Sequence, residues 1–261
     1  MSTIRVSDPR RTVRTDVVRR EPGRYAARLA STLEEVDAAL RLRFEVFNVE
    51  RGEGLARSFR TGRDEDEFDT AFDHLIVCDG EGAVVGTYRL QTAAAAPRGL
   101  YVGREFDLSA VPAPLLAGAV ELGRACIAPE HRNTRVLLAL WRGIADYVAR
   151  HRSRYLLGCC SLPGTDPALA LESLGRLRAF GLMHDWLFVE PMAAYAAAPG
   201  ETEAAFPPVP LPPLFAMYLR YGARVCSGPA IDREFGTTDF LVLLDVEGLD
   251  RRSRVLFFGD A

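Results

Sequence analysis

Lysine is absent from the 261-residue chain, so all 32 of its basic residues are arginine. This absence excludes a Schiff-base lysine, a lysine general base and the lysine of a Walker-type phosphate loop. A cationic side chain that binds an anion here must be arginine or histidine. Asparagine and glutamine are also scarce, with only Asn48, Asn133 and Gln91. The bias is typical of a GC-rich coding genome and by itself says little about function.

Long apolar runs and metal-binding spacings are also missing. No apolar run reaches the roughly 20 residues that span a bilayer, and the N-terminus lacks the apolar core of a signal peptide. The five cysteines show no CxxC or Cys/His spacing, so we expect reduced core thiols. The four histidines show no ligand spacing either. The sequence therefore predicts a cytoplasmic protein without a bound metal.

Charge is distributed unevenly along the chain. The net charge of −3 argues against general nucleic-acid binding. Residues 1–28 carry eight arginines against three acids, so the remainder carries −8. Such a basic segment suits an acidic partner or an anionic membrane surface at the inner membrane face, and it equally suits a solvated tail. We predict a flexible basic arm over 1–24 and a single domain over 25–261.

Hydrophobic periodicity predicts alternating strands and helices. Thr32-x-x-Glu35 matches a capping box before the helix expected over 33–50. Further helices are expected after Asn133, over most of 167–198 and over 214–221, with a proline-rich surface loop at 199–213. The strands are expected at 25–30, 74–78, 84–92, 119–127, 155–161, 225–231 and 238–246. This order predicts a mixed α/β sheet in a single domain.

The most informative stretch is 119–161, which is expected to form a strand, a tight loop, a helix and a strand. A helix N-terminus presents free amides and the positive end of the helix dipole, so it can bind a phosphate. The donors expected there are His131, Arg132, Asn133 and Arg135. An ordinary strand–helix turn is the alternative interpretation.

This order of elements resembles the GNAT acyltransferase superfamily, in which the loop holds the phosphates of the acyl donor. The resemblance implies a mixed, mostly antiparallel central sheet flanked by helices. Residues Arg132-Asn133-Thr134-Arg135-Val136 contain none of the glycines usual in that loop. The departure favours a donor with one phosphate, the phosphopantetheine arm of acyl carrier protein, over coenzyme A. No bound cofactor is expected.

More specific segments resemble the bacterial ornithine–acyl carrier protein N-acyltransferases, which make lyso-ornithine lipid. They run in order from about residue 25 to 247. One departure is Ala216, where that family commonly has lysine. The segments are Glu121-Leu-Gly-Arg124, Arg132-Asn133, Leu140-Trp-Arg-Gly143, Gly158-Cys-Cys-Ser161, Pro163-Gly-Thr-Asp-Pro167, Pro212-Pro-Leu214, Tyr218-Leu-Arg220, Ile231-Asp232 and Phe235-Gly-Thr-Thr-Asp239.

A second resemblance is to the acyl-homoserine-lactone synthases, which also use acyl carrier protein. The tryptophan that those synthases place soon after the phenylalanine is missing between 48 and 60, which disfavours this alternative. The matching residues are Arg43-Phe-Glu-Val-Phe47, Asp69, Asp73, Arg89, Glu121 and Arg124.

Glu121 opens an otherwise apolar or small-residue strand, so its carboxylate is expected to be partly buried with a raised pKa. The resemblance implies that it is the general base, acting directly or through water. The alternative is an ion pair with Arg124 or Arg89. One of these arginines is expected to hold the carboxylate of the acceptor amino acid. Arg124 follows Glu121 by three positions, so the two share a face only if the strand is bulged.

Two acids, Asp69 and Asp73, lie four positions apart. In a helix they would share a face and could hold an ammonium group. The alternative is a loop-ordering role, with Arg43 in an ion-pair network with either acid. Asp66 and Glu67 are expected to be solvated.

Three further roles complete the site. Backbone amides near Cys126 or Ile127 are expected to hold the oxyanion of the transition state. Ser161 is expected to donate a proton to the leaving thiolate. Asp239 belongs to a shared motif, so the resemblance implies that it binds substrate. The cysteines are interpreted as core residues, because direct attack by an amine needs no enzyme nucleophile.

The first hypothesis is an acyl carrier protein-dependent N-acyltransferase that acylates ornithine or a similar amino acid with a 3-hydroxyacyl chain. Alternatives within enzymes are another N-acyl amino acid synthase and an acyl-homoserine-lactone synthase. A different class is a non-catalytic acyl carrier or lipid-binding module. The presence of Glu121, Arg124 and Asp239 favours an enzyme.

Overall fold

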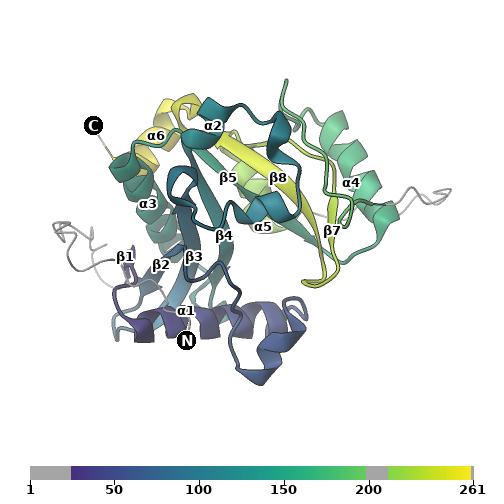
Figure 1. Cartoon of the computed structure of the whole chain (residues 1–261). Coiled ribbons are helices and arrows are strands. Elements are labelled where there is room, and N and C mark those ends of the chain that lie inside the picture. The colour runs from purple at the N-terminus through teal and green to yellow at the C-terminus, as the bar shows by residue number, and fades with distance from the viewer. Residues whose placement is uncertain (1–24, 198–210, 260–261) are drawn as a thin grey trace.

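The computed structural model describes residues 25–197 and 211–259, so the predicted arm of 1–24 and most of the predicted loop at 199–213 lie outside the described residues. One eight-stranded sheet has the order β1-β2-β3-β4-β5-β8-β6, and β7 also pairs with β8 (Figure 1). The strands are β1 (Ala26–Leu29), β2 (Asp73–Cys78), β3 (Val84–Thr92), β4 (Ala119–Ile127), β5 (Tyr155–Pro163), β6 (Arg224–Val225), β7 (Ala230–Asp232) and β8 (Thr237–Asp245).

Helices cover both faces of this sheet, as the GNAT resemblance predicts. On β2, Leu75 and Val77 pack with α3, whereas the alternate residues Ile76 and Cys78 pack with Ala39 of α1. The two helices therefore lie on opposite faces, because successive strand residues point to opposite sides. The helices are α1 (Leu33–Phe44), α2 (Ala113–Ala117), α3 (Thr134–His151), α4 (Pro167–Ala179), α5 (Pro213–Arg220) and α6 (Arg251–Phe258).

The predicted first helix has the expected extent but changes its hydrogen bonding. The Thr32 side chain accepts a bond from the amide of Glu35, which starts α1. After Phe44 the chain continues as a π-helix over Glu45–Glu50. Such π turns are uncommon and often occur at functional sites. Here the π-helix begins two residues after Arg43, whose side chain is buried.

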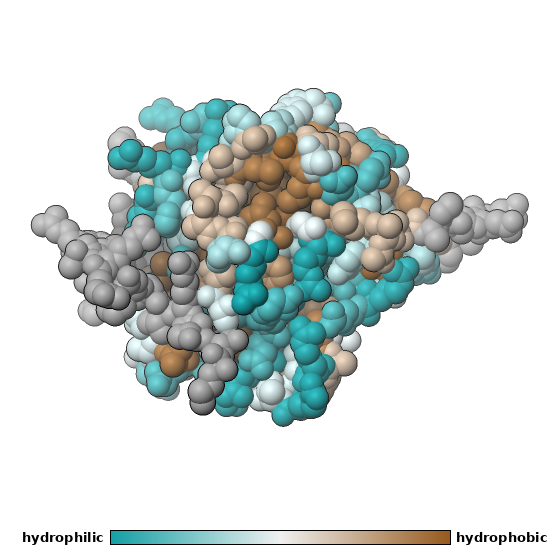
Figure 2. All heavy atoms as spheres, viewed as in Figure 1, coloured by the Kyte–Doolittle hydropathy of each residue, from teal (hydrophilic) through white to brown (hydrophobic). Residues whose placement is uncertain are grey.

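The helix predicted over 167–198 is wrong beyond Ala179. The chain reverses at Gly181, whose φ of 65° lies in the region that favours glycine. The segment that follows forms isolated bridges to the β6–β7 region, including Met183 to Val225 and Val189 to Ser227. Leu187 and Val189 are therefore buried by sheet contacts instead of by a helical face, whereas Trp186 and Phe188 stay exposed. Figure 2 shows hydrophobic residues gathered over the region of β5 and β8.

The two parallel strands of the sheet separate along their length. β4 pairs with β5 only from Ala119 to Glu121. Beyond that point β4 stays with β3, and β5 stays with β8. The divergence opens a pocket of about 190 Å³ between β4 and β5. Among the described residues, no helix is long and apolar enough to cross a membrane.

Candidate active site

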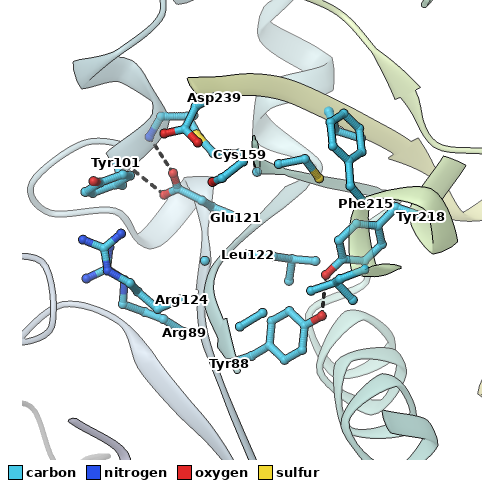
Figure 3. Close-up of a pocket in the computed structure, with 18 of the residues that line it drawn as sticks. Tyr88, Arg89, Tyr101, Glu121, Leu122, Arg124, Cys159, Phe215, Tyr218 and Asp239 are labelled. Atoms are coloured by element: carbon cyan, nitrogen blue, oxygen red, sulfur yellow. Dashed lines mark hydrogen bonds between the residues drawn. The ribbon is translucent and has the colours of Figure 1, made fainter. Parts of the chain in front are cut away.

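The pocket between β4 and β5 has two chemically different ends. At one end, Figure 3 places Glu121 and Asp239 near Tyr101, with Arg89 and Arg124 below them. The opposite end is largely apolar and aromatic. The labelled residues at that end are Leu122, Tyr88, Phe215 and Tyr218. One pocket can therefore hold a charged group at one end and an apolar chain at the other.

Glu121 lies inside this pocket with only 2% of its surface exposed. Its carboxylate accepts bonds from Gln91 Nε2 at 2.7 Å, from the amide of Tyr101 at 3.0 Å and from the amide of Val102 at 2.7 Å. Burial raises the pKa of Glu121, although these three donors and nearby Arg89 oppose the rise. The predicted ion pair is not the main contact, because both oxygens are bound by neutral donors. Glu121 therefore also anchors the 99–102 loop.

Arg124 reaches the same pocket because β4 is bulged. Pairing with β3 shifts between Thr87 and Arg89, and Arg124 has a φ of 51°. Because of this bulge, Arg124 and Glu121 line the same pocket. The sequence allowed the two residues to share a face only if the strand was bulged. Its guanidinium lies 4.4 Å from the centre of the Phe235 ring.

The Arg124 guanidinium is only partly engaged by acids. Its Nε lies 3.2 Å from Asp64, and its Nη2 lies 3.4 Å from Asp66. Its Nη1 makes no hydrogen bond to a described residue. Arg89 also has donors left over, because it contacts acids only through its Nη1 and its Nε has no partner among the described residues. Of the two arginines predicted to hold a carboxylate, Arg124 is the more accessible, with 10% of its side chain exposed against 1% for Arg89.

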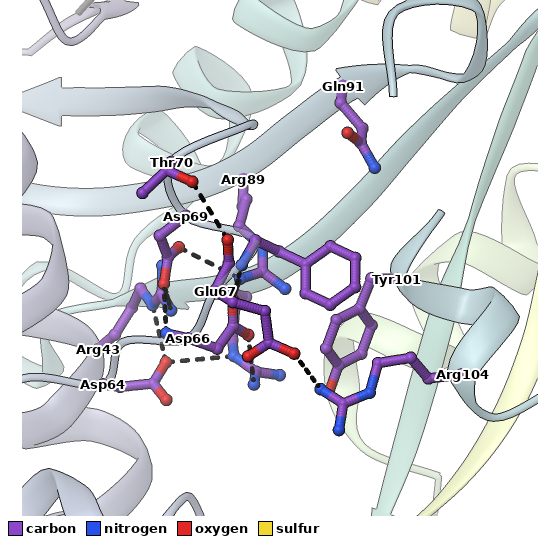
Figure 4. Close-up of polar contacts among 12 residues, drawn as sticks. Arg43, Asp64, Asp66, Glu67, Asp69, Thr70, Arg89, Gln91, Tyr101 and Arg104 are labelled. Atoms are coloured by element: carbon purple, nitrogen blue, oxygen red, sulfur yellow. Dashed lines mark hydrogen bonds and ion pairs between the residues drawn. The ribbon is translucent and has the colours of Figure 1, made fainter. Parts of the chain in front are cut away.

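Arg89 belongs to a buried ion network with Arg43 (Figure 4). Arg43 donates to Asp64 at 2.8 Å and to Asp69 at 2.7 Å, whereas Arg89 donates to Asp66 at 2.7 Å. Burial works to raise the pKa of Asp69, but the two arginines outweigh it and hold that pKa well below its usual range. The prediction that Arg43 pairs with Asp69 is confirmed by this contact. The prediction that Asp66 is solvated is wrong, because its side chain is 1% exposed.

Asp73 lies apart from this network. It begins β2 and accepts a hydrogen bond from Tyr147 at 2.7 Å. Asp69 and Asp73 are not on one helix, because Asp69 lies in a turn that leads into the strand. The proposed shared helical face is therefore wrong. The two acids that do lie close together are Asp66 and Asp69, which are three positions apart in the sequence. Both form ion pairs with arginines.

The predicted phosphate site lies at the N-terminus of α3. Asn133 caps the helix and accepts bonds from the amides of Arg135 and Val136. Arg132 is bound through two nitrogens to Glu50, and His131 contacts the hydroxyl of Tyr25. The guanidinium of Arg135 is exposed and makes no hydrogen bond or ion pair with a described residue. Among the predicted phosphate donors, Arg135 is therefore the arginine whose guanidinium remains available to bind a phosphate.

The predicted oxyanion donors lie where β4 has separated from β5, just beyond Ala125, and neither Cys126 nor Ile127 lines the pocket itself. The amide of Ala128 donates to Val85 of β3. Successive strand amides point to opposite edges, so the Ile127 amide faces the open edge and the Cys126 amide faces β3. Ser161 also lines the pocket, on β5 opposite Asp239. Among the five cysteines, all are free and only Cys159 is not fully buried.

Sequence analysis also missed Glu105, an acidic residue of the pocket. Glu105 follows a short 3₁₀ turn in the 94–118 segment and is 1% exposed. Glu105, Cys159 and Asp239 bring one ligand atom each to within 4.8 Å of one another. Their chemistry would allow a metal ion, a possibility that no spacing in the sequence indicated. The cluster unites three distant segments, so no local pattern could have revealed it.

Known proteins resemble both the fold and the chain as a whole. A family model described as an acetyltransferase (GNAT) domain matches residues 42–142. The crystal structure of TofI in a ternary complex with an inhibitor and MTA matches with a TM-score of 0.50 and 15% identity, over 91% of this chain and 98% of that chain. That likeness concerns the fold alone. Fold and family model together define a GNAT-type acyltransferase.

Curated relatives identify the family. The L-ornithine N(alpha)-acyltransferase of Agrobacterium fabrum is 36% identical, over 92% of this chain and 87% of its own length. The protein of that name from Rhodobacter capsulatus is 34% identical, over 90% of this chain and 95% of its own length. The chain belongs to the family of L-ornithine N(alpha)-acyltransferases. The sequence resemblance to that family is therefore confirmed.

Proposed function

We propose that this protein transfers a 3-hydroxyacyl chain from acyl carrier protein to the α-amine of ornithine, giving lyso-ornithine lipid. The observation that carries the proposal is the pocket between β4 and β5, with its charged end around Glu121 and Arg124 and its apolar end around Tyr88 and Phe215. The acyl chain of the thioester needs the apolar end, and the small zwitterionic acceptor needs the charged end. The two ends must adjoin so that the reactants can meet. The names of the curated relatives supply ornithine as the acceptor.

The reaction joins the amine nitrogen to the thioester carbonyl carbon and breaks the carbon–sulfur bond. Arg124 holds the acceptor carboxylate through its free Nη1, which orients the α-amine. Glu121 takes the amine proton through water, because its own oxygens are already occupied by neutral donors. The Ile127 amide stabilises the oxyanion, and Ser161 returns a proton to the departing thiolate. No covalent enzyme intermediate is needed.

The donor proposal depends on the N-terminus of α3. Arg135 supplies the cation for the single phosphate of phosphopantetheine, together with His131, Arg132 and Asn133. To bind the phosphate, Arg132 must either break its ion pair with Glu50 or contact the phosphate while that ion pair stays intact. Acyl carrier protein is the favoured donor because this loop lacks the glycines that let a diphosphate approach the backbone.

The test is release of free thiol from 3-hydroxyacyl-acyl carrier protein. Purified protein should release thiol only when ornithine is added, and acyl-coenzyme A should be a poorer donor. Arg135→Ala should raise the KM for the loaded carrier about fivefold to tenfold through loss of one charged contact. Glu81→Gln, an exposed charge change in the β2–β3 turn, is the control.

Other outcomes would favour other functions. Binding of the loaded carrier without thiol release, whatever amino acid is added, would indicate a non-catalytic binding module. Turnover with a different amino acid would indicate another N-acyl amino acid synthase. Turnover with S-adenosylmethionine would indicate a homoserine-lactone synthase. Equal use of acyl-coenzyme A would overturn the carrier-protein part of the proposal.

Membrane contact belongs to the same proposal. The acylated product is amphipathic, so release at the inner membrane face would remove it from water. The basic residues of 1–28 suit an anionic surface by charge. Cosedimentation with anionic vesicles at low salt, lost on deleting residues 1–24, tests this contact.

A further inference from the structure

A second acidic group lies in the pocket beside Glu121. Glu105 comes from the segment after the 3₁₀ turn Tyr101–Arg104, Cys159 comes from β5 and Asp239 comes from β8. The Cys159 thiol donates to Glu105 at 3.6 Å, and all three ligand atoms lie within 4.8 Å of one another. We call Glu105 and Asp239 the acidic pair.

The acidic pair has unused acceptor capacity. Asp239 is 4% exposed; its Oδ2 accepts a long bond from Thr237 at 3.3 Å, and its side chain also interacts with Ser161 and Glu105. Its Oδ1 is buried and has no hydrogen-bond partner among the described residues. Glu105 is 1% exposed, and its side chain contacts Asp239 and the weak thiol donor of Cys159. A buried carboxylate oxygen without a donor is costly, so these positions are suited to a ligand that donates.

The surrounding charge favours a cation. Asp232 also lines the pocket and repels the negative charge of both members of the acidic pair. Arg124 opposes this repulsion, but it is already shared with Asp64 and Asp66. Burial and the neighbouring acids raise the pKa of Glu105 well above its usual value, and burial raises that of Asp239 to about 6. Negative charge on the pair is therefore unfavourable unless a cation lies beside it, and an ammonium group supplies that charge.

An ammonium group suits the cluster better than a metal ion. A divalent metal would bind the deprotonated sulfur of Cys159. Burial and the negative charge of Glu105 and Asp239 raise the pKa of that thiol well above its usual value. An ammonium group needs only acceptor oxygens and offers three donors. The acidic pair supplies those oxygens without deprotonating the thiol.

We infer that the acidic pair binds the side-chain ammonium of the acceptor amino acid and so selects an acceptor with a second amine. The inference rests on the proposed function, since it concerns the same pocket and reaction. Arg124 at the acceptor carboxylate and the acidic pair at the far amine would hold the two ends of the acceptor. The α-amine between them would then face Glu121. Glu105 and Asp239 are thus specificity residues of this site.

The experiment compares two acceptors that differ only in the second amine. Ornithine and norvaline share the same carbon chain, so their ratio of kcat/KM isolates the contribution of the side-chain ammonium. Wild-type protein should prefer ornithine by about 100-fold or more. Asp239→Asn and Glu105→Gln should each lower this ratio by about 10-fold to 100-fold, the range for one charge-assisted contact. Glu81→Gln, exposed in the β2–β3 turn, should leave the ratio unchanged.

Each result separates this inference from the proposed function. If wild-type protein acylates norvaline as well as ornithine, the inference fails and the proposed function stands. If both variants lose activity on the two acceptors equally, the pair has a structural role and the inference is overturned. If wild-type protein acylates no amino acid, the proposed function itself fails. A stoichiometric divalent ion that survives EDTA and gel filtration would make the cluster a metal site and would also overturn it.

Discussion

Gly158 lies directly against the carbonyl oxygen of Leu122, at the point where the two parallel strands part. A Cβ atom on Gly158 would sit 2.4 Å from that oxygen, well inside contact distance. The pairing of β4 with β5 stops one residue earlier, at Leu157. The absence of a side chain at Gly158 therefore lets the strands meet closely before they diverge. The shape of the pocket depends on this contact.

Gly158→Ala should force β4 and β5 apart. We expect a loss of about 1–3 kcal/mol in the free energy of unfolding, as for other overpacked positions, and a loss of turnover. Urea unfolding and the thiol-release assay measure the two effects. Gly175→Ala on α4 is the matched control, because a Cβ there meets nothing within 4 Å and should stabilise the helix slightly. Equal stability of the two variants would contradict the conclusion that the strands need the missing side chain of Gly158 for their close contact.

Arg43→Ala should destabilise the protein strongly. The change leaves Asp64 and Asp69 buried without their shared guanidinium, and breaking such a pair typically costs about 3–5 kcal/mol. Arg41→Ala on the same helix removes an exposed pair with Asp37 and should change stability by less than about 0.5 kcal/mol. Chemical denaturation compares the two. A loss below about 1 kcal/mol for Arg43→Ala would show that Arg89 and Arg124 replace it.

Glu121→Gln should affect both structure and chemistry. A glutamine amide can accept from Gln91 and Tyr101, but its NH₂ group would then face the amide of Val102, which is also a donor. We expect a loss of about 1–3 kcal/mol in stability. The base role is measured separately, because loss of a general base removes the acidic limb of the pH–rate profile. If turnover falls but the acidic limb of the pH–rate profile is unchanged, Glu121 is not the general base and serves only to anchor the 99–102 loop.

Asp239→Asn should gain stability relative to wild type as pH rises. Burial raises the pKa of Asp239 to about 6, against 3.8 for the ordinary group; its charged neighbours are Glu105, Asp232 and Arg124, and the neutral thiol of Cys159 lies beside it. Between about pH 4 and pH 6 the folded state binds a proton that the unfolded chain has released, so stability falls as pH rises.

Asparagine removes this penalty. The difference in stability between variant and wild type should therefore move in favour of the variant from pH 4 to pH 7, by about 1.4 kcal/mol for each pKa unit. Thermal unfolding across this range measures the difference, with Glu81→Gln as the exposed control. A difference that does not change with pH would contradict a raised pKa at Asp239.

Local patterns in the sequence were enough to predict most elements. Alternation marked the strands at 84–92 and 119–127, and Asn133 marked the start of α3, because these features depend on neighbours in the chain. The helix predicted through residue 198 failed because Gly181 turns the chain. The buried position of Asp66 was also missed, since its partner Arg89 lies on β3, 23 residues away.

The sequence by itself determined the class of fold, the family and the position of Glu121 on its strand. It could not decide whether Glu121 and Arg124 share a face, because a β-bulge depends on how β4 pairs with β3. It also could not place Glu105 beside Asp239, which lies 134 positions along the chain. That contact exists because β8 inserts next to β5 while a 3₁₀ turn brings Glu105 over the same strands. Long-range packing therefore decided what the pocket can bind, whereas local chemistry decided the elements that build it.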